Sequence, residues 1–206
     1  SPTLGYIYRR RKDNRRALEV YGNVEELLKQ EDNPELCDAR IRLASAFLEM
    51  GEMDRARDHA MTAFEETEGQ MDIVHARARA VIGRYYAKAK ENELAMQYYS
   101  GALDILSDQT DPHSAVEVAM LLGQVLSDAG RKEEAAEHYV DAMVLAEAND
   151  FRMLQGELLA RLGEVESDRS QKMDYLQRSL TVFRDLGAVD RMLEVQASVH
   201  LAVMGN

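Results

Sequence analysis

The chain has 206 residues, of which 46% are hydrophobic, so it can bury a sizeable core, and this argues against global disorder. Its formal net charge of −12 disfavours nucleic acid as the main partner, because phosphates would be repelled. No apolar run approaches the roughly 18 residues of a membrane span, and the single cysteine, Cys37, rules out an internal disulfide.

A lone thiol favours a reducing compartment, so we expect a cytoplasmic protein, with a nuclear location left open. Only three prolines interrupt a sequence rich in Ala, Leu, Glu, Arg and Met, which favours helix nearly everywhere. The chain opens with Ser1-Pro2 and leads straight into a helical pattern. We therefore expect a fragment of a longer protein or a processed terminus.

The first sixteen residues are basic, whereas the remainder is acidic. The cations lie within eight residues of one another and are Arg9, Arg10, Arg11, Lys12, Arg15 and Arg16. Two interpretations stay open, a solvated helix end and turn or a patch for partner binding or localisation.

A small residue that follows an aliphatic one recurs along the chain. The pairs are Leu4-Gly5, Leu43-Ala44, Ile82-Gly83, Leu122-Gly123 and Leu162-Gly163, spaced 39, 39, 40 and 40 residues apart. We call the small residue of each pair the anchor. Such a period indicates a repeat architecture in which each repeat is one supersecondary unit.

Further positions recur at fixed offsets from the anchor. Bulky residues lie three positions after it, at Tyr8, Phe47, Tyr86 and Leu126. Alanines lie twelve after it, at Ala17, Ala56, Ala95 and Ala135, and Tyr21, Ala60, Tyr99 and Tyr139 lie sixteen after it. Small anchors and alanines would let two helix backbones approach closely, with the tyrosines filling the space beyond. The fifth repeat breaks phase because its turn is about three residues shorter, and sliding it brings Leu176 and Ser179 into register.

Turn signals divide each repeat into two helices. Gly51 and Gly130 suit a helix C-terminus, and Asn33-Pro34 and Asp111-Pro112 suit a helix start, with a capping side chain before proline. We expect one repeat domain over residues 1–206 with about 10–11 helices. Its repeats span approximately 1–33, 34–69, 70–110, 111–149 and 150–187, and a terminal capping or partial-repeat helix spans 188–206.

The anchor, the aromatic three residues on and the later Ala-Tyr-Ala ladder resemble the tetratricopeptide repeat. The best matches are Gly83 with Tyr86, Ala95, Tyr99 and Ala102, and Gly123 with Ala135, Tyr139 and Ala142. The usual tryptophan is missing, and the period exceeds the typical 34 residues, as in longer-repeat variants found in polarity and spindle-orientation adaptors and bacterial regulators. The resemblance implies an all-α, right-handed α-α superhelix of antiparallel helix pairs, with the first helix of each pair lining an inner groove.

Helical phase selects the residues of each first helix that face this groove. The candidate partner-binding residues are Tyr6, Arg10, Ile41, Arg42, Ser45, Arg77, Arg84, Lys88, Glu117, Met120, Gln124, Asp128, Glu157, Glu164 and Asp168. Cations gather in the early repeats and carboxylates in the late ones, so we expect an extended or helical partner segment of opposite polarity. Tyr6, Ile41 and Met120 would supply apolar contact. The competing interpretation is a merely solvated concave wall.

The sequence shows no pattern typical of catalysis. The five histidines lack metal-ligand spacing with one another or with Cys37, and no phosphate loop, nucleophile elbow or calcium loop is present. Cys37 lies near a helix start, which can lower a thiol pKa, although a structural thiol is the simpler interpretation. We therefore expect no catalytic residue, metal or cofactor.

The function that these observations favour is a non-enzymatic scaffold that binds a protein or peptide partner in the groove. The alternative is a sensor or regulatory module of a larger transcriptional or signalling protein. Binding of a chaperone's acidic tail is disfavoured, because none of the residues directly after the anchors is asparagine. The terminal helix exposes apolar residues, among them Leu193, Val199 and Val203, and is a candidate surface for self-association.

Overall fold

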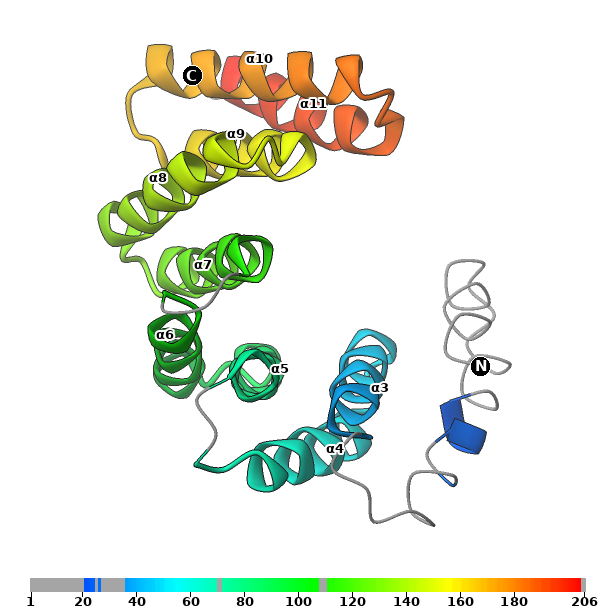
Figure 1. Ribbon diagram of the computed structural model, residues 1–206. Helices are drawn as coiled ribbons and strands as arrows, with labels where there is room; N and C mark the ends of the chain where they lie inside the picture. Colours follow the sequence, from blue (N-terminus) through cyan, green and yellow to red (C-terminus); the bar gives the residue numbers. More distant parts are fainter. Residues whose placement is uncertain (1–20, 25, 27–35, 70–71, 108–110, 205–206) are drawn as a thin grey trace. The chain divides into compact units, whose positions relative to one another are not determined.

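The computed structural model describes residues 21–24, 26, 36–69, 72–107 and 111–204 (Figure 1). The basic N-terminal cluster, Tyr6, Arg10 and the helix start expected at Asn33-Pro34 lie outside these residues. The chain forms two compact units, Ser1–Ile105 and Leu106–Asn206. Each unit is described by itself.

Every regular element within the described residues is helical, which confirms the expected all-α class. The first unit contains α3 (Cys37–Met50), α4 (Met53–Glu66), α5 (Ile73–Lys88) and most of α6 (Asn92–Ser107). The last two residues of α6 belong to the second unit. The second unit contains α7 (Pro112–Asp128), α8 (Lys132–Ala148), α9 (Arg152–Val165), α10 (Arg169–Asp185) and α11 (Val189–Met204). In the part of the chain described, no helix is both long and apolar enough to span a bilayer.

Short turns join the helices in pairs, as the repeat pattern predicts. Gly51 lies at the end of α3 and Gly130 lies in the turn after α7. Their φ angles are 82° and 83°, a left-handed conformation that glycine adopts without strain. Asp111 caps α7, because its carboxylate accepts a hydrogen bond from the Ser114 backbone N–H at 3.1 Å, and Pro112 is the first helical residue. The pairs α3–α4, α5–α6, α7–α8 and α9–α10 are thus helical hairpins.

The anchors lie where the two helices of a hairpin approach most closely. A Cβ placed on Gly83 would stand 2.7 Å from the Tyr99 ring, and one on Gly123 would stand 2.4 Å from the Tyr139 ring. Both rings are 1% exposed. The α3–α4 hairpin uses another combination, because its anchor, Ala44, already carries a Cβ and the residue sixteen positions on is also alanine. A glycine with a tyrosine, or two alanines, fills the same space.

The fifth repeat is shortened by three residues as its sequence predicts, but in its first helix and not in its turn, because three residues join α7 to α8 and three join α9 to α10. The α9 helix ends at Val165, two residues after Gly163, whereas α7 ends at Asp128, five residues after Gly123. The side chain against Gly163 is accordingly Leu176, thirteen residues on, and a Cβ on Gly163 would meet it at 2.8 Å. One turn further along, the buried Ser179 hydroxyl donates a 2.7 Å hydrogen bond to the Gly156 carbonyl.

The core of each unit runs between its hairpins as well as within them. In the first unit, Leu43 and Phe47 of α3, Ala60 of α4 and Ile82 of α5 belong to one buried cluster. In the second unit, Phe183 of α10 and Val195 of α11 share a buried cluster. Each hairpin therefore contributes one side to its neighbour's core, as in other stacked repeats.

Replacing Gly123 with alanine tests the close approach of α7 and α8. Alanine is favoured over glycine in a helix interior by about 1 kcal/mol, but overpacking a rigid core costs about 1–3 kcal/mol. We expect a net loss of up to about 2 kcal/mol in the free energy of unfolding, measured by urea denaturation. With Tyr139→Ala already present, the same Gly123→Ala change should instead stabilise, because no ring opposes the new Cβ. Equal losses in both backgrounds would contradict the assignment.

Candidate functional site

The first helices of the first unit, α3 and α5, carry five of the predicted binding residues on neighbouring surfaces. We call this surface the first wall; it consists of Asp38, Arg42, Ser45 and Glu49 of α3 with Arg77, Arg84 and Lys88 of α5. Ion pairs join the two helices, because Arg77 Nη1 lies 3.4 Å from Asp38 Oδ1 and Arg84 Nη2 lies 3.6 Å from Glu49 Oε1. Arg42, on the same helix as Asp38, lies 2.7 Å from that carboxylate. Arg42, Arg77 and Arg84 are therefore brought together here.

The first wall has an excess of positive charge. Its four cations, Arg42, Arg77, Arg84 and Lys88, face two carboxylates, Asp38 and Glu49. Lys88 is exposed and, within the described residues, forms no ion pair. Since the pairs on this surface are partly exposed, each contributes little to stability, typically below about 1 kcal/mol. Their charges stay accessible to a partner.

The first helices of the second unit, α7 and α9, form a surface of the opposite sign. We call it the second wall; it consists of Glu117, Gln124 and Asp128 of α7 with Glu157, Arg161 and Glu164 of α9. Arg161 Nη1 donates to Gln124 Oε1 across the two helices, and Gln124 Nε2 donates to Asp128 Oδ1 at 2.8 Å. Glu157 accepts from Arg191 of α11, a contact that helical phase did not predict, because Arg191 belongs to the terminal helix.

Three of the predicted binding residues were assigned wrongly. Ile41 and Met120 are each 7% exposed and belong to the cores, so they offer no apolar surface. Helical phase predicts one buried side for each first helix, but α3 contacts both α4 and α5, and α7 contacts both α8 and α9. Asp168 is not on a first helix, because α9 ends early, at Val165, and Asp168 is the N-cap of α10, where its carboxylate accepts from the Gln171 backbone N–H at 2.8 Å.

Comparison with known proteins extends to structure only. No protein-family profile matches the sequence, and no curated protein sequence matches it. A signal transduction ATPase with numerous domains and a tetratricopeptide repeat sensor, from Pyrococcus horikoshii, superposes with a TM-score of 0.79 at 17% identity over 98% of this chain. A Rap protein complexed with competence and sporulation factor superposes with a TM-score of 0.86 at 14% identity, also over 98% of this chain.

A third structure, of tetratricopeptide-like repeats from a putative kinesin light chain of Podospora anserina, has a TM-score of 0.72 at 12% identity and covers 90% of this chain and 94% of its own. The chain has the fold of a tetratricopeptide-repeat array. It spans 32% of the Pyrococcus protein and 58% of the Rap protein. At these identities the similarity establishes the fold alone.

Within the tetratricopeptide-repeat fold, α3, α5, α7 and α9 are first helices and α4, α6, α8 and α10 are second helices. Both walls therefore lie on first helices. The α11 helix follows α10, with Val195 buried against that helix. The described residues include no group of three or more His, Cys, Asp or Glu side chains placed to hold a metal ion.

Cys37 is a buried thiol whose pKa is raised, contrary to the lowering that its position at a helix start can produce. The side chain is 3% exposed, and its Sγ–H donates to Glu66 Oε2 at 3.0 Å. Burial, and then the hydrogen bond to the Glu66 carboxylate, raise the pKa of Cys37 to about 11. The thiol therefore stays protonated near neutral pH, which makes it a poor nucleophile.

His75 links α4 to α5 as a neutral side chain. Its Nε2 accepts a hydrogen bond from Arg79 Nε at 3.1 Å, so the ring proton must be on Nδ1, which lies 2.9 Å from Thr67 Oγ1. Thr67 in turn donates to the Ala63 carbonyl at 2.8 Å. Burial, and then the nearby Arg79 guanidinium, lower the pKa of His75, and the opposing effects of Asp72 and Glu68 are smaller.

Acidification should destabilise the first unit through His75. Because the pKa of His75 is lower in the folded chain than its ordinary value of 6.5, the unfolded chain binds the proton first. The stabilisation is complete above that ordinary value and is lost as pH falls from it towards the folded value. We expect the free energy of unfolding, measured in urea between pH of about 7.5 and 5.5, to fall more steeply for the wild type than for His75→Gln. Parallel curves would contradict the neutral assignment.

Proposed function

We propose that this chain is a protein-interaction module that holds a protein or peptide partner against its first helices. The observation that carries this proposal is the sign difference between the walls. The first wall has four cations and two carboxylates, whereas the second has the four carboxylates Glu117, Asp128, Glu157 and Glu164 and a single cation of its own, Arg161. Such surfaces favour partner segments of complementary charge and speed their arrival.

The expected partner of the first wall is an acidic segment. Lys88 is exposed, and Arg77 and Arg84 are held towards α3 by Asp38 and Glu49. An incoming carboxylate can share these guanidinium groups, which have several donors each. The expected partner of the second wall is basic. We expect no nucleic acid, membrane or cofactor to be involved, and a cytoplasmic location remains the accompanying expectation.

A sensor or regulatory module within a larger protein is the second candidate. The chain matches 98% of its length to a protein described as having a tetratricopeptide repeat sensor, yet spans 32% of that protein. A full-length chain with an appended DNA-binding, kinase or nucleotide-binding domain would support this role. In both candidate functions the first helices hold the partner. In the second, binding of the partner would also regulate another domain of the larger protein.

Charge reversal at Lys88 and Arg84 tests the first wall. Lys88 forms no ion pair within the described residues, whereas reversal of Arg84 also breaks its pair with Glu49. We expect Lys88→Glu with Arg84→Glu to weaken capture of an acidic partner at least about ten-fold, since each exposed charge affects chiefly steering and two are reversed. Affinity capture, followed by titration of the captured partner, is the measurement. Lys90→Glu, in the α5–α6 turn, makes a matched control.

The exchange of Arg84 and Glu49 (Arg84→Glu with Glu49→Arg) separates partner binding from helix contact. It retains an ion pair between α3 and α5 and the excess positive charge of the first wall, so stability should be kept and affinity should fall less than in the reversal. Unchanged affinity in the reversal would remove the first wall from the proposal.

We also propose that copies of the chain associate through α11. Leu193, Leu201 and Val203 are 60%, 71% and 50% exposed. Val199, which the sequence also suggested, is half-buried against the cluster of Phe183 and Val195 and is not part of this surface. A helix with so much exposed apolar area favours association.

Light scattering at increasing concentration tests this association. We expect the mass to rise with concentration for the wild type and to stay monomeric for Leu193→Glu with Leu201→Glu, because two charges would be buried in the interface. Val144→Glu is the matched control, since Val144 is 63% exposed on α8 of the same unit. A wild type that stays monomeric at high concentration would rule out the proposal.

A further inference from the structure

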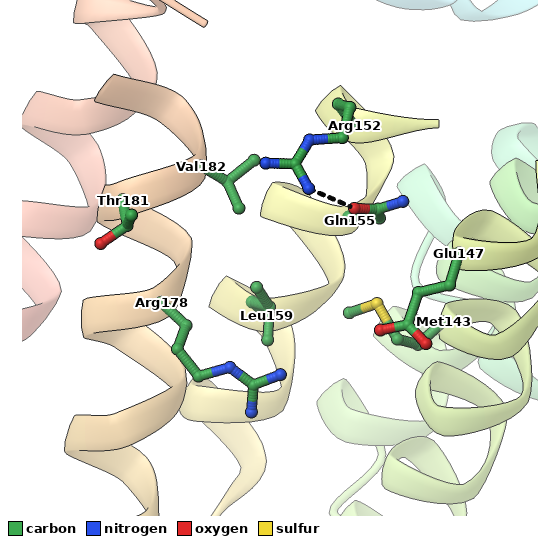
Figure 2. Close-up of a pocket in the computed structure, with 8 residues that line it drawn as sticks. All are labelled: Met143, Glu147, Arg152, Gln155, Leu159, Arg178, Thr181 and Val182. Atoms are coloured by element: carbon green, nitrogen blue, oxygen red, sulfur yellow. Dashed lines mark hydrogen bonds between the residues drawn. The ribbon is translucent and has the colours of Figure 1, made fainter. Parts of the chain in front are cut away.

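A cavity of about 320 Å³ opens on the second-helix side of the second unit, between α8, α9 and α10 (Figure 2). Its α9 residues, Arg152, Gln155 and Leu159, lie about half a helical turn around the axis from Glu157 and Glu164. The cavity is therefore on the opposite side of α9 from the second wall. Its volume is at the small end of ligand pockets, which run from about 300 to 1,000 Å³, and suits a ligand of a few heavy atoms.

Two guanidinium groups reach this cavity from different helices. Figure 2 shows Arg152 of α9 and Arg178 of α10 on either side of Leu159. Arg178 Nη1 lies 3.4 Å from Asp174 Oδ2, one helical turn earlier on α10. Both side chains are exposed, so this ion pair is weak. Arg152 forms no pair with a carboxylate within the described residues; its Nη1 donates to the neutral Gln155 Oε1 at 3.3 Å.

Gln155 holds Arg152 in place. It is 8% exposed, and its Nε2 donates a 3.0 Å hydrogen bond to the Ala146 carbonyl at the end of α8. A buried side chain with both of its polar ends bonded has little freedom. The Arg152 guanidinium is thus directed by the junction of α8 and α9, and its remaining N–H groups are available for a carboxylate.

The rest of the lining defines the other parts of a ligand. Met143, Leu159 and Val182 supply apolar surface, and the Glu147 carboxylate faces the cavity from α8. A ligand that matches this lining carries a carboxylate for one of the arginines, an aliphatic group for the apolar side chains and an N–H donor for Glu147. A phosphate fails this test, because it has no aliphatic group to offer and its negative charge would be repelled by Glu147.

We propose that this cavity binds an aliphatic α-amino acid, either free or as the last residue of a peptide. Both forms present a carboxylate, an aliphatic side chain and an N–H group on one carbon. The site is independent of the walls on the first helices, so each proposal can fail without the other.

Methyl NMR spectra of the whole chain, labelled at Met, Leu and Val methyl groups, provide the test. The probes are leucine, N-acetyl-leucine, the tripeptide Gly-Gly-Leu and leucinamide, which lacks the carboxylate. We expect saturable shifts of the Met143, Leu159 and Val182 methyl signals with at least one carboxylate-bearing probe and none with leucinamide. A response to leucine alone identifies the free amino acid as the source, and a response to the tripeptide and N-acetyl-leucine identifies a peptide C-terminus.

Variants connect the shifts to the arginines. Arg152→Gln with Arg178→Gln should weaken binding by about ten-fold or more, because the charge-assisted bonds to the carboxylate are lost. Arg184→Gln, on α10 outside the cavity, should bind as the wild type does, and an unchanged melting temperature in all variants shows that the fold is kept. Equal shifts with leucinamide, undiminished binding by the double variant or no saturable shift with any probe would each overturn the proposal.

Discussion

Each described hairpin depends on contact between a small anchor on its first helix and a side chain on its second. Gly83 and Gly123 receive the rings of Tyr99 and Tyr139, Gly163 receives Leu176, and a Cβ on any of the three glycines would meet its neighbour within 2.8 Å. Because interiors pack as tightly as crystals, the volume removed at one position must be supplied at the other. This constraint sets how deeply the two helices approach and therefore which of their faces stay open for the next hairpin.

Stacking of the hairpins gives each first helix two neighbouring helices. The surface of the first helix that neither neighbour covers carries charged side chains. In the first unit, Asp38 and Glu49 of α3 meet Arg77 and Arg84 of α5. In the second, Arg161 of α9 reaches Gln124 of α7, and Arg191 of α11 reaches Glu157. These pairs are too exposed to hold the stack together, since apolar contacts such as Phe183 with Val195 dominate that task. Their main consequence is a pair of surfaces of different sign, each of which we propose to hold a different partner segment.

The two sides of α9 differ in what they can recognise. Glu157 and Glu164 are on the first-helix side, where long and flat surfaces suit an extended chain. Arg152 and Leu159 are on the other side, where α8 and α10 enclose a cavity large enough for one amino acid. Two buried titratable groups elsewhere are held in their neutral forms, His75 by burial and Arg79, and Cys37 by burial and Glu66.

The sequence alone determined the helical hairpins, their period and the three-residue slip of the fifth repeat, because anchors and turn residues act within one hairpin and a few residues suffice to specify it. It could also place Arg77, Arg84 and Gln124 on first-helix surfaces. Tertiary structure decided the burial of Ile41 and Met120, the capping role of Asp168 and the raised pKa of Cys37. It alone brought Arg152 and Arg178 to one cavity. Those outcomes depend on contacts between separate hairpins and on the exact end of each helix, which helical phase along one element does not encode.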